Sequence, residues 1–270
     1  MKKILVLTDF SQNAEAAIRF AIQLASQSNF ALTFFYVCQI MRPTQWKETI
    51  YASFEKDELR SYKNRLQKYV TAVYERSGIP TTEKIEIEVQ NGINTETNIL
   101  EFSSKNKYDY LCISRHGHGN SLSLFGSITS HLITKSEIPV IVIPSNYQVS
   151  QINSITYVSD LTNLEKELKL TKEFSDAIGA EIELLHFTSA DDDLRHLNTL
   201  NVPVKAHYEP LKYEKTLIEN MEDVLKNGKT SMLIMFTKQK RNFFEKLFIS
   251  SISAEYASTS NIPLLVFKKP

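Results

Sequence analysis

The chain has no excess charge, few cysteines and no long apolar run. Its 31 Lys and Arg residues balance 31 Asp and Glu residues among 270, which argues against non-specific binding to nucleic acid or to anionic membranes. The apolar run after Met1, Lys2 and Lys3 spans only residues 4–7, too short for a signal peptide or a membrane span. The sequence therefore favours a cytoplasmic protein with no membrane partner and no nucleic-acid partner.

Several chemical signatures are also missing. There are two cysteines, Cys38 and Cys112, and both stand in apolar runs, which predicts buried thiols rather than a disulfide or a redox pair. No Walker loop, Gly-x-Gly-x-x-Gly, Gly-x-Ser-x-Gly or Cys-x-x-Cys occurs. His116 and His118, one residue apart in a loop, are more often ordinary loop residues than metal ligands. With no positioned base in view, an enzyme is the least favoured class, and we expect slow hydrolysis at most.

Short apolar runs alternate with segments of helical period. Residues 3–7 and 31–37 have the pattern of strands covered on both faces, and the apolar residues between them recur at helical spacing after Ser11 or Asn13 as N-cap. A β-α-β unit of this length requires a parallel pair and a right-handed crossover. The first half is completed by a long amphipathic helix within 44–76 that ends near Gly78, a half-exposed strand at 84–89, a helix at 94–106, strands at 109–113 and 139–144, and a helix ending near Lys135.

The polar stretch 145–151 separates two halves that follow one plan. Four segments of the second half mirror four of the first in the same order, which indicates an internal duplication. We therefore place one domain at residues 1–146 and a second at residues 152–270. The mirrored segments are 155–162 with 4–11, 181–187 with 31–37, 232–236 with 110–114, and 262–267 with 138–143.

A glycine-containing turn follows the apolar run 110–113. It contains Gly117, and Gly126 stands where the next helix begins. Glycines let the backbone approach a phosphate, and the first amides of a helix point toward an anion with the helix dipole behind them. The turn therefore predicts a phosphate site in the first half. Its counterpart, residues 237–251, has no glycine, so we expect no nucleotide in the second half.

These signals together resemble the universal stress protein family, over nearly the whole chain and in the arrangement of its tandem members. They are an opening strand ending Leu-Thr-Asp-Phe-Ser, a second strand ending Tyr-Val, the Ser-x-His-Gly turn, Gly-Ser, and a closing Ile-Pro-Val-Ile-Val-Ile-Pro. The resemblance implies two tandem doubly wound α/β domains, each a five-stranded parallel sheet of the adenine nucleotide alpha hydrolase type. It implies an intrachain pseudo-dimer through the last strands, 140–143 against 264–267, and leaves open whether two chains associate further.

The resemblance also implies an adenine-nucleotide site, with ATP and Mg as the expected ligands. The family pattern is Gly, two residues, Gly, nine residues, then Gly with Ser or Thr. Here Ser114 replaces the first glycine, and eight residues separate Gly117 from Gly126. If Ser114 had to adopt a left-handed backbone it would cost about 1–2 kcal/mol. The predicted nucleotide-binding residues are Thr8, Asp9, Val37, Ser114, Arg115, His116, Gly117, Gly126, Ser127, Ile128 and Thr129.

Two functions follow from this sequence. The first is a regulatory protein of the stress response that binds an adenine nucleotide in its N-terminal domain, with Asp9 at the ribose or base end because a carboxylate repels phosphate. The second is a scaffold or interaction protein of the same fold whose site is empty.

Overall fold

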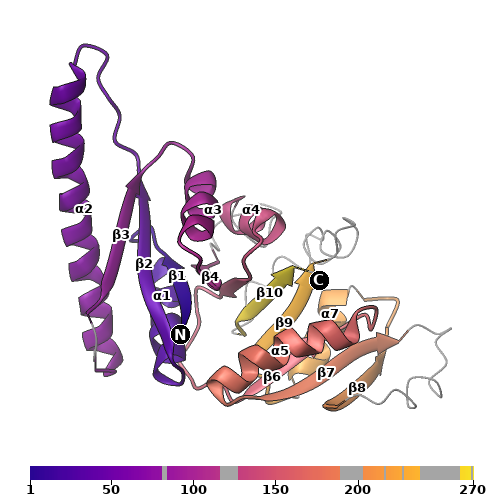
Figure 1. Cartoon of the computed structure of the whole chain (residues 1–270). Coiled ribbons are helices and arrows are strands. Elements are labelled where there is room, and N and C mark those ends of the chain that lie inside the picture. The colour runs from indigo at the N-terminus through magenta and orange to yellow at the C-terminus, as the bar shows by residue number, and fades with distance from the viewer. Residues whose placement is uncertain are drawn as a thin grey trace.

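The computed structural model shows a single continuous sheet with helices on its faces (Figure 1). The structure describes residues 1–80, 84–115, 127–188, 203–215, 217–226, 228–237, 262–268 and 270. The strand order is β3-β2-β1-β4-β5-β10-β9-β6-β7-β8. Each half thus contributes five strands in the same internal order, and the two sets meet at β5 and β10. The fold is α/β, with tandem doubly wound parallel sheets.

The first half follows the predicted alternation of strands and helices. Gly78, in a left-handed conformation with φ of 67°, ends the long helix α2, and the side chain of Asn94 caps α3 by accepting a hydrogen bond from the Thr97 amide. Asn13 occupies the N-cap position of α1 but its side chain accepts no capping bond; instead Ser11 Oγ accepts from the Ala14 amide at 3.1 Å. The elements are β1 Lys2–Leu7, α1 Ala14–Ser26, β2 Phe30–Cys38, α2 Glu48–Ser77, β3 Glu86–Asn91, α3 Thr95–Lys105, β4 Tyr110–Ser114, α4 Ser127–Lys135 and β5 Val140–Ile143.

The second half repeats this strand order, with the five strands that the resemblance implies. The sequence located β6, β7, β9 and β10, but not α5, β8 or α7. β8 is the outer strand of the sheet, and its polar sequence KAHYEP gives little apolar signal. The elements are β6 Ser154–Val158, α5 Leu164–Ile178, β7 Glu181–Thr188, β8 Lys205–Pro210, α7 Leu217–Lys226, β9 Met232–Thr237 and β10 Leu264–Lys268. Residues 191–202, expected to replace the long helix, lie outside the described residues.

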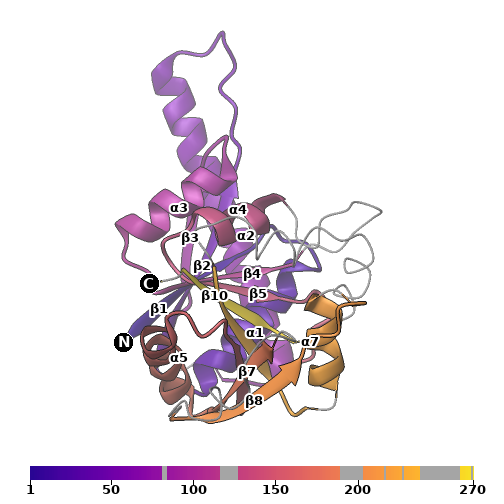
Figure 2. The same cartoon turned by 90° about the vertical axis from the view of Figure 1, so that its right-hand side faces the viewer.

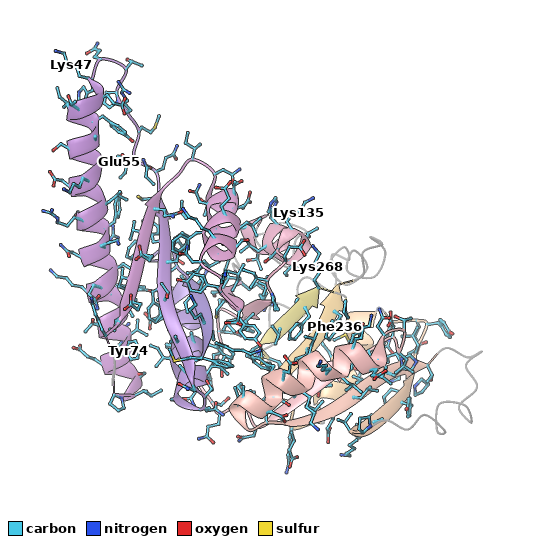
Figure 3. All side chains as sticks on the ribbon, viewed as in Figure 1. Lys47, Glu55, Tyr74, Lys135, Phe236 and Lys268 are labelled. Atoms are coloured by element: carbon cyan, nitrogen blue, oxygen red, sulfur yellow. The ribbon has the colours of Figure 1, made fainter. Side chains whose placement is uncertain are left out.

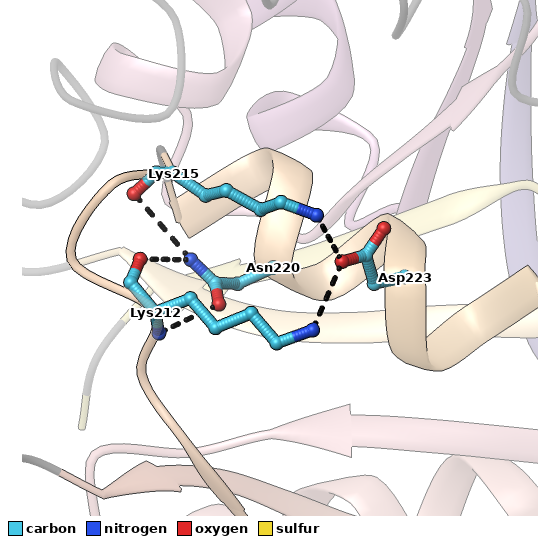
Figure 4. A network of polar contacts seen from close by, with 4 residues as sticks. All are labelled: Lys212, Lys215, Asn220 and Asp223. Carbon is cyan, nitrogen blue, oxygen red and sulfur yellow. Dashed lines mark hydrogen bonds and ion pairs between the residues drawn. The ribbon is translucent and has the colours of Figure 1, made fainter.

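A polar network joins α7 to the turn that precedes it (Figure 4). The side chain of Asn220, 2% exposed, accepts from the Lys212 amide at 2.9 Å and donates to the Lys212 carbonyl at 3.1 Å. Lys215 Nζ donates to Asp223 Oδ2 at 2.6 Å, and this contact lowers the pKa of the Asp223 carboxyl. The network fixes the chain direction between β8 and α7.

The two halves meet through strands and through an aromatic cluster. β5 and β10 lie antiparallel, with Val142 opposite Leu264 and Val140 opposite Val266, which are the strands through which we expect the halves to pair. On one face of the sheet, Phe174 of α5 packs against Tyr110 of the first half, with ring centroids 5.4 Å apart. The exact domain limits, 1–146 and 152–270, stay a prediction because the sheet runs on across them.

Two expectations about buried groups and membranes have direct outcomes. Cys38 and Cys112 are buried free thiols, as predicted, and burial raises the pKa of the Cys112 thiol. Within the described part of the chain, no helix has the length and apolarity needed to cross a membrane.

Candidate functional site

A pocket of about 380 Å³ lies at the carboxyl ends of β1, β2 and β4, beside the first turns of α3 and α4. Strand β1 lies between β2 and β4, so the pocket marks the point where the strand order reverses, which is where open parallel sheets bind ligands. Its volume is in the range of small-molecule sites. The lining residues are Leu7, Thr8, Asp9, Ala14, Phe35, Tyr36, Val37, Thr95, Ile99, Ile113, Ser114, Ile128 and Thr129.

The turn after β1 places Asp9 at this pocket. Thr8 Oγ1 accepts from the Phe10 amide at 3.2 Å, and Asp9 Oδ1 accepts from the Ser11 amide at 2.9 Å. Phe10 has a φ of 63°, a left-handed conformation that costs an L-residue free energy and that surrounding contacts must maintain. Its ring provides such contacts, since it packs against Tyr36 with centroids 4.7 Å apart. The direction of the Asp9 carboxylate is therefore set by a braced turn.

The end of β4, the strand beside β1, forms another part of the pocket wall. Ser114 is the last residue of β4 and pairs with Ile143 of β5, so it has the extended backbone of a strand and not the left-handed one that would have penalised its replacement of glycine. Its Oγ donates to the Ile143 carbonyl at 3.4 Å. Arg115 follows, 8% exposed, and burial lowers the pKa of its guanidinium to about 10. The residue therefore remains a cation at neutral pH, held beside the strand end.

The family model described as "Universal stress protein family" matches residues 1–144, more than half of the 270 residues. The chain belongs to the universal stress protein family. A universal stress protein from Archaeoglobus fulgidus DSM 4304 has a similar structure, with a TM-score of 0.67, 15% identity, and coverage of 99% of this chain and 98% of that one. A putative universal stress protein from Pseudomonas aeruginosa UCBPP-PA14 has a TM-score of 0.57 and 10% identity, with coverage of 99% of this chain and 93% of that one. These likenesses show the fold. No curated protein matches the chain.

The structure brings together six of the predicted nucleotide-binding residues of this universal stress protein. They line the one pocket described above, and they are Thr8, Asp9, Val37, Ser114, Ile128 and Thr129. Arg115 adjoins the pocket without lining it, and Ser127 begins α4. His116, Gly117 and Gly126 lie outside the described residues. That any of these residues binds a nucleotide stays a prediction.

Sequence reasoning missed the contribution of helix α3 and of the aromatic side chains. Thr95 and Ile99 reach the pocket from the first turns of α3, and Phe35 and Tyr36 reach it from the end of β2. The carboxyl end of β2 was a usable signal, because parallel neighbours end at the same edge of the sheet. The two α3 residues gave no signal, because their position depends on where the crossover after β3 places the helix.

The second half of this universal stress protein repeats the turn that follows β1, at residues 159–162 after β6, but different side chains surround it. Leu161 has a φ of 64°, its amide donates to Ser159 Oγ at 3.0 Å, and the Thr162 amide donates to Asp160 Oδ1 at 3.0 Å. These are the contacts of the first turn, residue for residue. At the place of Ser114 stands Phe236, whose ring stacks on Phe267 with centroids 5.0 Å apart.

Proposed function

We propose that this universal stress protein binds an adenine nucleotide, ATP with Mg, in the pocket of its first half and acts as a regulatory protein of the stress response. The observation that carries the proposal is the meeting of six sequence-predicted residues in one pocket at the strand-order reversal. The family membership supports it from a second direction.

The lining suits a nucleoside. Phe35, Val37 and Ile113 offer apolar surface for a purine ring, and most of a ligand pocket is usually apolar with a few polar groups that set orientation. Asp9, held by the Ser11 amide, is an acceptor suited to ribose hydroxyls. A carboxylate at this end repels phosphates, so the phosphate chain extends in the other direction.

The other end of the pocket suits phosphates. Ile128 and Thr129 lie in the first turn of α4, where amides without helical partners and the helix dipole favour an anion. Arg115, a buried cation whose pKa burial depresses, gains from an anion placed nearby. Among the described residues, no group of three His, Cys, Asp or Glu side chains is arranged for a metal, so Mg would be carried by the phosphates and by water.

Calorimetric titration with ATP and Mg tests the proposal. We expect stoichiometric binding to the unchanged protein and loss of most of it in Ile128→Trp, because the larger ring occupies the pocket. Ile93→Trp is the matched control, since Ile93 is 88% exposed and lines no part of the pocket. Asp9→Asn removes the charge but keeps the shape, and we expect binding weaker by about tenfold, the effect of one charged hydrogen bond of roughly 1.5 kcal/mol.

The rival function makes a different forecast. If the unchanged protein takes up no ATP at millimolar concentration, the site is empty and the chain is an interaction protein of the same fold. Equal binding by Ile128→Trp and Ile93→Trp would place the nucleotide elsewhere. Slow ATP hydrolysis that disappears in Ile128→Trp would add an enzymatic activity to the same pocket.

A further inference from the structure

The free end of helix α2 is a surface that neither the fold nor the pocket uses. α2 has 30 residues and is therefore about 45 Å long, and its N-terminal end extends past the strands and the other helices (Figures 1 and 2). Its buried residues are Leu66, Val70 and Val73, all in the C-terminal half. Figure 3 labels Lys47 at the free end and Tyr74 near the other. We call residues 40–58 the α2 tip.

The α2 tip is built as an ordered unit. Tyr51 Oη donates to the Ile40 carbonyl at 2.9 Å, and Asn91 Nδ2 donates to Glu55 Oε1 at 2.6 Å, which ties the helix to the end of β3. Trp46 packs edge-on against Phe54 with ring centroids 5.2 Å apart. These contacts hold a stretch of helix that would be marginal in isolation.

Apolar side chains are exposed on this ordered unit. Met41 is 74%, Ile50 53% and Phe54 38% exposed. They are three of the seven large apolar side chains recorded as exposed in the described residues, gathered within 14 positions of the sequence. A clustered, ordered apolar surface of this kind marks an interaction site more often than scattered single residues do.

The charges beside the apolar pair identify a partner. Ile50, Phe54, Asp57 and Ser61 are all exposed, and their spacing of three and four residues places them on one stripe of the helix. Lys47, also exposed, is the N-cap residue at the free end of that stripe. The order along the stripe is a cation, two apolar residues and an anion. When a second copy of the helix is laid alongside in the opposite direction, each cation meets an anion and each apolar residue meets an apolar residue.

We propose that the α2 tip is the contact between two copies of this chain, packed antiparallel about a two-fold axis near residue 52. In this register Ile50 faces the partner's Phe54, and Lys47 faces the partner's Asp57. A two-fold axis makes each contact occur twice. Like charges lie about 15 Å apart along the axis, ten residues at 1.5 Å each, beyond the screening length of about 8 Å at physiological salt.

The rest of the fold leaves this surface available. The last strands β5 and β10 pair with each other inside the chain, so association of two chains requires a different surface. The proposed contact is small, with four apolar side chains and two exposed ion pairs. Small interfaces are transient, so we expect a dimer whose population rises steeply with protein concentration.

Sedimentation velocity over a concentration series tests the contact. Lys47→Glu and Asp57→Lys each set like charges opposite one another twice, and we expect each to weaken self-association by about tenfold, as expected for two exposed ion pairs turned to repulsion. The double variant Lys47→Glu with Asp57→Lys restores attraction in the reversed sense, and its dissociation constant should return to that of the unchanged protein. Ile50→Ser should abolish association.

The control is Lys68→Glu. Lys68 is exposed on the same stripe and carries the same charge change, but it lies beyond the overlap of the two helices, so association should not change. Helical content by circular dichroism checks that each variant is folded. A chain that is monomeric at every concentration overturns the proposal and leaves the α2 tip to a different protein. A dimer that ignores the charge reversals, or responds equally to Lys68→Glu, also overturns it.

Discussion

The first and second halves share a backbone plan and differ in what fills it. The turns after β1 and β6 have the same hydrogen bonds and the same left-handed residue, with φ of 63° at Phe10 and 64° at Leu161. Val6 and Ala16, which stand before and after the first turn in the sequence, are both fully buried. Seven residues beyond each turn's aspartate, the second half has Glu167 where the first has Ala16.

The replacements in the second half form a buried group of large side chains. Tyr157, fully buried, stands where the first half has Val6, and its hydroxyl donates to the Glu167 carboxylate, which is itself 2% exposed. Phe236 packs edge-on against Tyr157 with ring centroids 5.7 Å apart. The two halves therefore keep the same turn backbone while the side chains around it differ in size. Of the three compared positions, only the one held by Ser114 in the first half and Phe236 in the second belongs to the pocket lining.

The largest expected effect is a loss of stability at the joint between the two halves, where an aromatic side chain of the second half packs into the first. Phe174 of the second half is fully buried and packs between Phe30 and Tyr110 of the first. Phe174→Ala should lower the free energy of unfolding by about 3–5 kcal/mol, the usual cost of removing a buried aromatic side chain. Tyr213→Ala, at a site 67% exposed, is the control and should have little effect.

Two probes show whether that loss is shared. The chain has one tryptophan, Trp46, in the first half, while circular dichroism reports on both halves. During urea unfolding of Phe174→Ala we expect both signals to shift together, because the aromatic cluster spans the joint. If the Trp46 transition stayed in place while a separate dichroism transition moved, the halves would unfold independently.

The sequence predicted the parts of the fold that depend on local patterns. Apolar runs located the strands of both halves, except β8, and Gly78 and Asn94 marked helix ends. It also located the strand ends that carry Asp9 and Val37. Local patterns carry no information on which distant side chains meet, so the packing of Phe174 across the joint was not foreseen.

The same reason explains what was missed in the pocket. Thr95 and Ile99 contact it only because α3 crosses to that side of the sheet. The effect of Ser114 was also beyond sequence reasoning, because the cost of replacing glycine depends on a backbone conformation that the pairing with Ile143 sets.

A smaller effect on stability is expected from glycine at the left-handed residue of each turn. Phe10→Gly and Leu161→Gly both relieve about 1–2 kcal/mol of left-handed backbone strain, but Phe10 loses its contacts with Tyr36 and with Arg65, whose guanidinium lies 4.5 Å from the ring centroid. Both side chains pack against the core, and the larger ring loses more, so the packing lost at Phe10, roughly 2–3 kcal/mol, exceeds the strain relief. We expect Leu161→Gly to stay within about 1 kcal/mol of the unchanged protein, and Phe10→Gly to be less stable than Leu161→Gly by about 1 kcal/mol.

Lys107→Gly calibrates that pair of variants. Lys107 has a φ of 53° and an exposed side chain, so glycine there relieves strain with little loss of packing. We expect stabilisation of about 0.5–1 kcal/mol, the strain relief less the added freedom of the unfolded chain. Urea midpoints of the three variants measure the series. Equal losses for Phe10→Gly and Leu161→Gly would show that the two turns are braced equally, contrary to the contacts described.

The smallest effect is a pH dependence that belongs to the first turn. Tyr69 Oη donates to the Ser11 carbonyl at 3.2 Å, whereas the second turn is held by His186, whose Nδ1 lies 2.8 Å from the Ser159 carbonyl oxygen. Burial, with a smaller contribution from Glu15, raises the pKa of Tyr69 to about 12, from about 10 in an unfolded chain. The folded state therefore keeps a proton that the unfolded state loses.

Stability from this tyrosine is complete below pH 10 and falls as the pH rises from about 10 to about 12. Arg115 opposes it, because its pKa is lowered to about 10 and the folded state loses that proton first. Urea unfolding at stepped alkaline pH should show that the free energy of unfolding declines with pH. The decline should be shallower in Tyr69→Phe, by at most the slope that one titrating proton gives. The matched control in the second half is Tyr208→Phe, at a ring whose centroid lies 6.3 Å from that of His186, and its slope should lie nearer to that of the unchanged protein. An identical slope in Tyr69→Phe and in the unchanged protein would mean that the phenol is as accessible in the folded chain as in the unfolded one, and that the first turn is braced by packing alone.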